Sequence, residues 1–481
     1  MQVSIRGLLY LLISFVLMAP SDAQSLDNKP NIIYILADDL GYGDLSCYGQ
    51  QKFETPNIDR LAAEGMMFTQ HYSGSTVCAP SRSSLLTGLH TGHTPIRGNK
   101  ELKTEGQLPL PDSSITIAEL LKSAGYATGA FGKWGLGFVG TEGDPNNQGF
   151  DVFYGYNCQR MAHRYYPPYL WHNQDSVLLE GNDWKQTVTY APDEIQKATL
   201  AFIDQHKSMP FFAYVPFVLP HAELISPNDS LFAKFDGVFE EHRPYMPDNN
   251  YASDYGINIV PKKYCSQIKP NATFASMVVR LDVYVGQIID KLEELGIADN
   301  TIVMFASDNG PHRAGGANPD FFNSNGSLRG LKCDLYEGGI RVPFIVRWPN
   351  VVEAGLVSHH VSAFWDLTPT LADISQSSLP IQTDGVSFLP TLTGKGNQKK
   401  HDSLYWEYNI KGGNIAVRKG KWKGIILNVK GNTQMELYDI VSDQAEHNDI
   451  AAEYPEIVEQ VKNIIAKEHM HSDLFPIHIS E

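Results

Sequence analysis

The chain has 481 residues, which is enough for one large domain or for a large and a small domain, each with its own hydrophobic core. It carries 38 lysines and arginines against 54 aspartates and glutamates, so its formal net charge is −16 at pH 7. This balance argues against nucleic acid or a long wrapped polyanion as a partner, because such partners need a basic face. A small anion could still bind in a locally basic pocket.

Residues 1–23 are predicted to be a signal peptide. Arg6 provides the positive start, an apolar run follows it, and Ser21 and Ala23 suit cleavage before Gln24. A signal anchor is the alternative, but the apolar run is short for a membrane span, and no later segment approaches roughly 18 uninterrupted apolar residues. We therefore expect a secreted or periplasmic protein without a membrane span.

Residues 24–380 alternate between strand-like and helix-like segments. The apolar run 32–37 ends in two aspartates, as expected of a buried parallel strand whose carboxyl end opens into a loop. An amphipathic helix pattern follows at 55–68, and helix-then-strand patterns recur at 114–134, 193–221 and 277–310. This alternation predicts an α/β domain: a large, mostly parallel sheet sandwiched by helices.

Two other regions depart from this alternation. Residues 222–265 fit neither period and are predicted to form a long irregular insertion, which at that length is functional or disordered. Residues 381–481 are predicted to form a smaller α+β subdomain, an antiparallel sheet plus a helix. Its short strands are expected at 403–409, 414–420, 421–429 and 435–440, and its helix at 454–469.

Two polar pairs follow two of the predicted strands. Asp38 and Asp39 close the first strand, and Asp308 and Asn309 close the strand before residue 308. Ligands bind outside the carboxyl ends of strands in open parallel sheets, so neighbouring strands would bring these oxygens together. Either pair alone is more often a helix cap or a turn, but two pairs favour a site for a hard cation, Ca²⁺ or Mg²⁺.

The segment "TVCAPSRSSLLTG", residues 76–88, places Cys78 before a helix-like stretch and Arg82 one turn further on. A helix N-terminus and an arginine both stabilise a nearby anion, so one interpretation is a thiolate nucleophile with a lowered pKa. The other is a buried structural cysteine, which the cysteine taken by itself favours.

Residues 78–88, "CAPSRSSLLTG", resemble the type I sulfatase signature C-x-P-S-R-x-x-x-L-T-G at every fixed position. Supporting motifs occur in the order found in that family, and the resemblance covers roughly residues 30–470. These motifs are "NIIYILADDLGYGD" at 31–44, "GKWGLG" at 132–137, "PH" at 220–221, "SDNG" at 307–310 and "LRGLKCDLYEGGIRVPF" at 328–344. The segments 416–425 and 436–440 also look similar.

The resemblance implies an alkaline-phosphatase-like fold and a formylglycine (3-oxoalanine) made from Cys78 by a formylglycine-generating or anaerobic sulfatase-maturating enzyme. One hydroxyl of its hydrate would attack sulfur. Deprotonation of the other would then expel sulfate and regenerate the aldehyde, an exit that a thiolate lacks. The implied metal is Ca²⁺ in preference to Mg²⁺. Its implied ligands are Asp38, Asp39, Asp308, Asn309 and modified Cys78.

The resemblance also assigns roles to four further residues. Arg82 would hold the hydrate, and Lys133 and Lys332 would bind sulfate oxygens. His221 would protonate the leaving alcohol.

The chain departs from the family at one position. Many members have a histidine where this chain has Gly135, and that histidine is assigned to deprotonating the second hydroxyl. His93 and His163 are the candidates for this role here, each set against a structural alternative.

Residues 150–173 are dense in aromatic side chains and include His163 and Arg164. Such residues could stack on sugar rings and bind a second anionic or hydroxyl-rich group, or they could form an aromatic core cluster. If these residues bind substrate, then together with export they predict an exo-acting enzyme that removes sulfate from a terminal sugar of a sulfated glycan. The resemblance implies that this sugar is a galactose or N-acetylgalactosamine sulfate. The alternatives are a phosphate or phosphonate ester hydrolase of the same superfamily and a non-catalytic sulfated-glycan-binding relative.

Overall fold

The structure is a computed structural model that describes residues 29–103, 105–246, 255–256, 264–379, 382–431 and 434–477. The predicted signal peptide, the predicted boundary at 380/381 and parts of the predicted insertion 222–265 lie outside these ranges.

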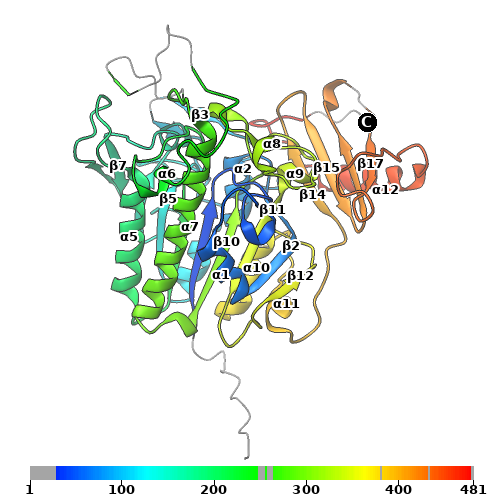
Figure 1. Cartoon of the computed structure of the whole chain (residues 1–481). Coiled ribbons are helices and arrows are strands. Elements are labelled where there is room, and N and C mark those ends of the chain that lie inside the picture. Colours follow the sequence, from blue (N-terminus) through cyan, green and yellow to red (C-terminus); the bar gives the residue numbers. More distant parts are fainter. Residues whose placement is uncertain are drawn as a thin grey trace, which may run out of the picture.

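An 11-stranded sheet forms the centre of the molecule (Figure 1). β11 and β7 run antiparallel to both of their neighbours and the other pairings are parallel, which confirms the predicted mostly parallel sheet. In spatial order the strands are β12 (Leu356–Ser358), β2 (Met66–Tyr72), β11 (Arg341–Arg347), β10 (Thr301–Ser307), β1 (Asn31–Ala37), β9 (Phe211–Pro216), β5 (Ala127–Lys133), β6 (Val152–Tyr156), β7 (Tyr169–His172) and β8 (Asp175–Leu178), and β13 (Ser362–Ala363) pairs with β2.

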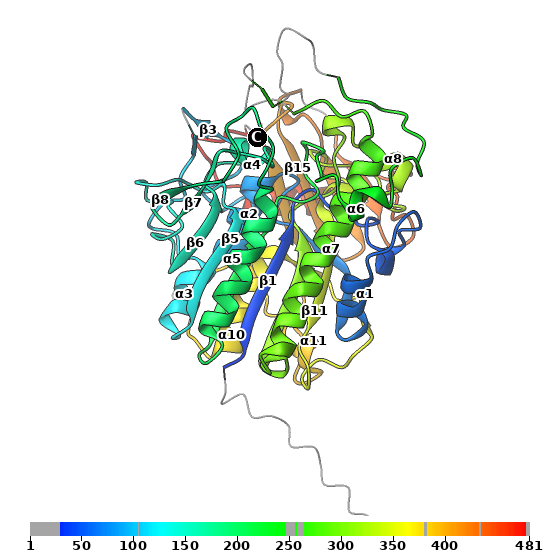
Figure 2. The same cartoon turned by 60° about the vertical axis from the view of Figure 1, so that its left-hand side comes forward.

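The sheet is buried on both faces because side chains along each strand alternate between two cores. On β1, Ile33 and Ile35 belong to the core under α1 (Pro56–Ala63), α5 (Ala191–His206) and α7 (Pro270–Glu294). Ile32 and Tyr34 belong to the opposite core, under α2 (Cys78–Thr87), α3 (Ile117–Ser123), α10 (Leu367–Ser375) and α11 (Leu389–Thr393). Figure 2 shows α5 and α7 lying across one face of the sheet. The predicted helical layers on both faces are therefore confirmed.

Helix α7 is long and apolar enough to cross a membrane by length and composition. However, 89% of its most apolar window is buried inside the molecule, where its side chains pack against the sheet and α5. The burial accounts for the apolar composition as that of a core helix.

A four-stranded antiparallel sheet forms the C-terminal part of the described chain, as predicted. Its strands are β14 (Leu404–Tyr408), β15 (Asn414–Lys419), β16 (Trp422–Ile426) and β17 (Glu436–Asp439), and α12 (Pro455–Glu468) packs on β15 and β16. A buried charge cluster joins this sheet to the large one: Lys423 Nζ lies 2.9 Å from both Glu337 Oε1 and Glu446 Oε1.

Short elements complete the described chain. They are the two-stranded pair β3 (Glu101–Leu102) and β4 (Gly106–Gln107), the helices α4 (Gln159–Ala162), α6 (Ser230–Ala233), α8 (Pro319–Phe322) and α9 (Glu337–Ile340), and 3₁₀ turns at Ser46–Tyr48, Ala298–Asn300, Ala314–Gly316, Phe364–Asp366 and Val429–Gly431.

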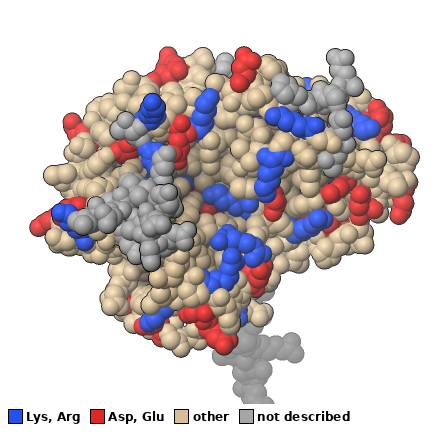
Figure 3. All heavy atoms as spheres, turned by 90° about the horizontal axis from the view of Figure 1, so that it is seen from above, with Lys and Arg blue, Asp and Glu red and all other residues tan. Residues whose placement is uncertain are grey.

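The carboxyl ends of β1, β5, β9 and β10 meet at the upper edge of the sheet in Figure 1. Seen from above, lysine and arginine side chains gather across the middle of this end of the molecule, whereas aspartates and glutamates lie mostly toward its margin (Figure 3). An acidic protein thus carries a locally basic face at the strand ends, where ligands of such sheets bind.

Candidate active site

The two predicted polar pairs meet at the ends of β1 and β10. These strands are adjacent and parallel, with Ala37 in register with Ser307, so the residues that follow them emerge side by side. The Asp39 amide donates to Asp308 Oδ1 at 3.1 Å, and Asn309 Nδ2 donates to Asp39 Oδ1 at 2.7 Å. Asp39 has a left-handed backbone, with φ of 64°, a conformation that aspartate tolerates better than most residues.

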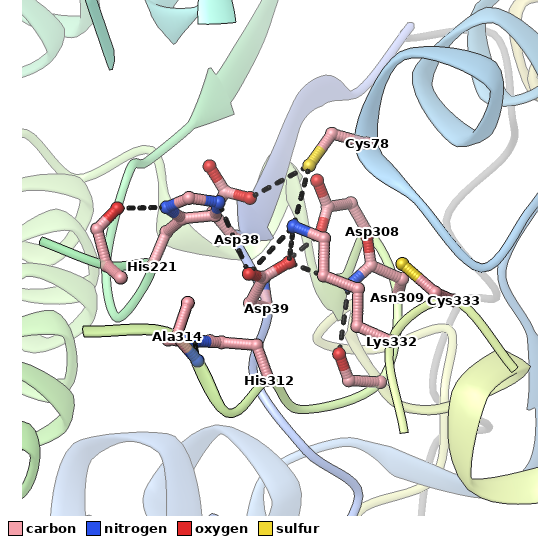
Figure 4. A network of polar contacts seen from close by, with 12 residues as sticks. Asp38, Asp39, Cys78, His221, Asp308, Asn309, His312, Ala314, Lys332 and Cys333 are labelled. Carbon is pink, nitrogen blue, oxygen red and sulfur yellow. Dashed lines mark hydrogen bonds and ion pairs between the residues drawn. The ribbon is translucent and has the colours of Figure 1, made fainter. Parts of the chain in front are cut away.

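Cys78 begins α2 and points at the same strand ends (Figure 4). Its sulfur lies 3.5 Å from Asp38 Oδ1 and 3.3 Å from Lys332 Nζ. Burial raises the pKa of the Cys78 thiol to about 12, although Lys133 and Lys332 oppose the shift. Desolvation and the nearby carboxylates thus outweigh the two cations, so the surroundings of the unmodified thiol favour the interpretation of Cys78 as a buried cysteine over that of a low-pKa thiolate.

Arg82 lies one turn along α2 and is fully buried. Its Nε and Nη2 donate to Asp308 Oδ2 at 3.2 and 2.8 Å, and its Nη1 donates to the carbonyl of Lys133 at 2.7 Å. Lys133 in turn donates from Nζ to Asp38 Oδ2 at 2.7 Å. The preceding Gly132 is required for this arrangement, because a Cβ there would lie 2.0 Å from the Pro216 carbonyl oxygen.

Lys332 lies in the segment before α9, and its side chain reaches the active centre formed by Cys78 and the two polar pairs. Its Nζ lies 2.7 and 2.8 Å from the two carboxylate oxygens of Asp39. Burial alone lowers the pKa of Lys332, but Asp39 and Cys78 outweigh it and raise that pKa well above its usual value. The lysine is thus held as an ammonium, a cation at the mouth of the site.

The charges at the centre act on one another strongly. Burial raises the pKa of Asp38, but Lys133 and His221 outweigh it and hold this pKa well below the usual range. Burial and the neighbouring Asp38 raise the pKa of Asp308 to about 6. Crowded carboxylates of this kind favour a bound cation, which relieves their mutual repulsion.

The donor set fits a hard divalent ion. One ligand atom each from Asp38, Asp39, Cys78 and His221 lie within 4.8 Å of one another. Asn309 Oδ1 is buried and accepts no hydrogen bond from the described part of the chain, while Nδ2 of the same amide contacts Asp39, so this side chain adds an amide oxygen without a protein partner next to the cluster. Carboxylate and amide oxygens are the ligands that Ca²⁺ and Mg²⁺ prefer.

Three histidines line one side of the centre. His221 Nε2 lies 3.3 Å from Asp39 Oδ2, and the His163 ring stacks on the His221 ring with centroids 4.5 Å apart. The ring of His312 lies on the same side, 5.5 Å from that of His221. Burial, assisted by nearby cations, lowers the pKa of both His163 and His221. His312 is not among the residues predicted from the sequence, although it follows the "SDNG" motif by only two residues.

Two predicted substrate-side residues lie elsewhere. His93 pairs through Nδ1 with Asp384 at 2.8 Å and lies with His90 and Glu468 in a cluster separate from that of Cys78. Arg164 has no exposed surface, and its guanidinium pairs with the buried Glu223 at 2.8 Å. The structure therefore brings His163 to the centre, places His93 beside a different cluster, and holds Arg164 in the interior.

The aromatic stretch 150–173 contributes mainly to the interior. Phe150, Phe153, Tyr156 and Tyr165 are all at most 1% exposed and belong to the two cores. The core interpretation of these aromatic residues therefore accounts for most of them.

Gly135 lies close to a polar pair that the sequence did not single out. A Cβ at Gly135 would lie 3.1 Å from Cγ of Gln159. Gln159 Nε2 donates to Asn99 Oδ1 at 3.2 Å, and the same oxygen accepts from the amide of Ala79 at 3.0 Å. The glycine position is thus linked through two amide side chains to the start of α2.

The comparison with protein families settles the membership of the chain. Residues 30–377 match the model of the family described as Sulfatase, and residues 332–471 match N-sulphoglucosamine sulphohydrolase, C-terminal. The chain belongs to the sulfatase family. It is a sulfuric ester hydrolase of the type I, alkaline-phosphatase-like group that its motifs resemble.

Individual sulfatases match over most of their length. An N-acetylgalactosamine-6-O-sulfatase from Bacteroides thetaiotaomicron is 30% identical, with 91% of this chain and 92% of the relative covered. Human arylsulfatase A is 32% identical, with 85% and 77% covered. Among solved structures, Ps i-CgsB in complex with k-i-k-neocarrahexaose has a TM-score of 0.76 at 27% identity, with 92% and 94% covered.

Proposed function

We propose that this sulfatase removes sulfate from a sulfated carbohydrate, acting at a terminal galactose or N-acetylgalactosamine sulfate. The observation that carries the proposal is the position of Cys78, the residue of the sulfatase signature, between the ammonium of Lys332 and the carboxylate of Asp38. The names of the relatives support a sugar substrate, since one is an N-acetylgalactosamine-6-O-sulfatase and one was solved in complex with k-i-k-neocarrahexaose.

The proposed nucleophile is the hydrate of a formylglycine derived from Cys78. Arg82 would orient it; this role is supported by the position of its guanidinium, one helical turn from Cys78 and held by Asp308 and the Lys133 carbonyl. Lys133 and Lys332 would bind sulfate oxygens and offset the charge that builds up as sulfur is attacked. Asp38, Asp39, Asp308 and Asn309 would hold Ca²⁺, which supplies Lewis-acid polarisation when bound.

His221 is proposed to protonate the leaving sugar oxygen. It lies beside the metal-binding carboxylate Asp39, and burial holds its ring in place between those of His163 and His312. His163 is proposed to take the role left open by Gly135, because of the two candidates it is the one that contacts the centre. An imidazole suits both roles because it can accept and donate a proton; burial lowers the pKa of both rings, and the negative charge of a sulfate ester would act to raise it.

Export and maturation complete the proposal. The signal-peptide pattern of 1–23 supports secretion or a periplasmic location, and a formylglycine-generating or anaerobic sulfatase-maturating enzyme would have to act on Cys78. Since the folded thiol is 1% exposed, we propose that this modification precedes folding.

The test is sulfate release from a panel of 4- and 6-sulfated galactose and N-acetylgalactosamine, with the corresponding phosphate esters as controls. We expect release from at least one sulfated sugar by the wild type and none by Cys78→Ala. Preferential hydrolysis of the phosphate esters would favour the phosphatase alternative. Binding of sulfated sugars without turnover by a wild type whose Cys78 is unmodified would favour the glycan-binding alternative.

A further inference from the structure

A cavity of about 490 Å³ opens beside the active centre. In the described part of the chain its large side chains are two arginines and two tyrosines, Arg243, Arg313, Tyr245 and Tyr264, and Pro244, Ala314, Gly315 and Gly316 also line it. This volume lies within the range of small-molecule sites, roughly 300–1,000 Å³.

Two contacts join the cavity to the three histidines beside the active centre. The Tyr264 ring lies 5.5 Å from the ring of His163 and 6.3 Å from that of His221. On the other wall, the amide of Ala314 donates to His312 Nδ1 at 3.0 Å, and Figure 4 shows both residues on the His221 side of the centre. A group that leaves from sulfur toward His221 therefore departs in the direction of this cavity.

The walls are held by backbone contacts. Tyr245 and Gln267 exchange two backbone hydrogen bonds of 2.7 and 2.8 Å, which fix the segment that carries Arg243 and Tyr245. Gly316 has φ of 95°, and a Cβ there would lie 2.9 Å from the Arg243 carbonyl oxygen. The two segments that carry the arginines therefore pack directly against each other.

The cavity is basic in an acidic protein. Among the described residues of its lining, the two charged ones are both arginines, while the whole chain carries a net charge of −16. Asp320 pairs with Arg313 at 2.6 and 2.7 Å and is 68% exposed, so one solvated carboxylate faces two guanidinium groups. Within the described ranges, Arg243 forms one hydrogen bond, from Nη1 to the Ala317 carbonyl at 3.3 Å. Guanidinium groups suit the planar oxygens of carboxylates and sulfates.

We infer that this cavity binds the sugar next to the one that is desulfated, and that Arg243 and Arg313 hold a carboxylate or sulfate group on that sugar. The inference rests on the proposed function, since His221 sets the direction of the leaving group. The rings of Tyr245 and Tyr264, 6.4 Å apart, offer apolar faces with polar edges to a sugar ring on the way to the arginines.

The test compares three disaccharides that share the terminal sulfated sugar cleaved by the wild type. Their second sugar is neutral, a uronic acid, or sulfated. We expect the wild type to show a kcat/KM roughly tenfold to a hundredfold higher for one acidic disaccharide than for the neutral one, the range expected of charge-assisted hydrogen bonds. Whether the uronic acid or the sulfated sugar is preferred identifies the anion.

The variants are Arg243→Gln and Arg243→Gln combined with Arg313→Gln, with Arg60→Gln on the outer surface of α1 as the control. The double variant should bring the acidic-to-neutral ratio close to one, the single variant should lower it, and the control should keep it. Unfolding midpoints of all variants verify that they fold. If the wild type cleaves the neutral disaccharide with a ratio near one, or if the double variant keeps the preference, the subsite is overturned while the proposed function stands. Failure of the modified wild type to release sulfate from any sugar would instead overturn the proposed function.

Discussion

The ammonium nitrogen of Lys332 lies 3.3 Å from the sulfur of Cys78 and within 2.8 Å of both carboxylate oxygens of Asp39. One cation therefore touches both the residue proposed to become the nucleophile and a residue proposed to bind the metal. This position suits a group that holds a sulfate oxygen while its sulfur is attacked.

Replacing Lys332 should slow the reaction without unfolding the protein. We expect Lys332→Met to lower kcat/KM for a sulfated sugar by about 100-fold or more, the usual cost of removing one preorganised transition-state donor. Steady-state kinetics measure this, with Lys197→Met on the exposed face of α5 as the matched control. An equal, small effect in both variants would contradict the role of Lys332.

The effect of His221 should depend on the leaving group. An alkyl or sugar alcohol needs a proton as it leaves, whereas a nitrophenolate leaves unassisted. His221→Asn should therefore lower kcat far more for a sugar sulfate than for 4-nitrophenyl sulfate. His242→Asn, on the surface, serves as the control. Equal losses of kcat on both substrates would mean that His221 acts in some way other than as a proton donor.

The metal site should be visible in stability as well as in activity. Adding Ca²⁺ to chelator-treated wild type should raise the unfolding midpoint, since a ligand at 100 times its dissociation constant stabilises by about 2.7 kcal/mol. Asn309→Ala removes the buried oxygen that has no protein partner and should weaken this response, while Asn146→Ala should not. An unfolding midpoint that changes neither with chelator nor with added Ca²⁺ would contradict the metal site.

The charge cluster between the two sheets predicts a pH dependence of stability. Burial raises the pKa of Glu337, but Lys423 and Arg341 outweigh it and hold that pKa near 2, below the 4.5 of a free glutamate. The stability that Glu337 contributes is therefore present above about pH 4.5 and is lost as the pH falls toward 2.

Glu337→Gln should accordingly cost about 3–5 kcal/mol of unfolding free energy at pH 7, because it breaks a buried ion pair, and less at pH 3. Glu446 is the matched control, because burial raises its pKa to about 7 and its contribution is lost as the pH rises. Glu446→Gln should thus cost less at pH 8 than at pH 4. Urea unfolding of the wild type and both variants across this pH range measures these costs. Equal costs of Glu337→Gln at pH 3 and pH 7 would refute the lowered pKa of Glu337.

Much of the fold could be predicted because the pattern of apolar residues along each segment matches the burial of the strand or helix that it forms. The run 32–37 is apolar throughout because β1 is central and covered on both faces, and its two aspartates fall just past the last paired residue, Ala37. That β10 lies next to β1 could not be read from the sequence; only the rule that ligands bind at the carboxyl ends of parallel strands suggested it. The register of the two strands, with Ser307 beside Ala37, is what brings the two polar pairs together.

Side-chain partners over long separations could not be predicted. Arg164 has no exposed surface, and its charge is neutralised by Glu223, 59 residues away in the sequence. No pattern near residue 164 predicts this partner. The raised pKa of Cys78 depends on desolvation by segments that meet only in three dimensions. Arg243 and Arg313 line one cavity from two distant segments, which no local pattern reveals.

The mass of the peptide that contains Cys78, measured on protein that releases sulfate, tests the central claim most directly. We predict that this peptide carries the mass loss of a thiol converted to an aldehyde, and that the converted fraction rises in proportion to specific activity across preparations made with and without a maturating enzyme. Full activity in a preparation whose Cys78 remains an intact thiol would contradict the account.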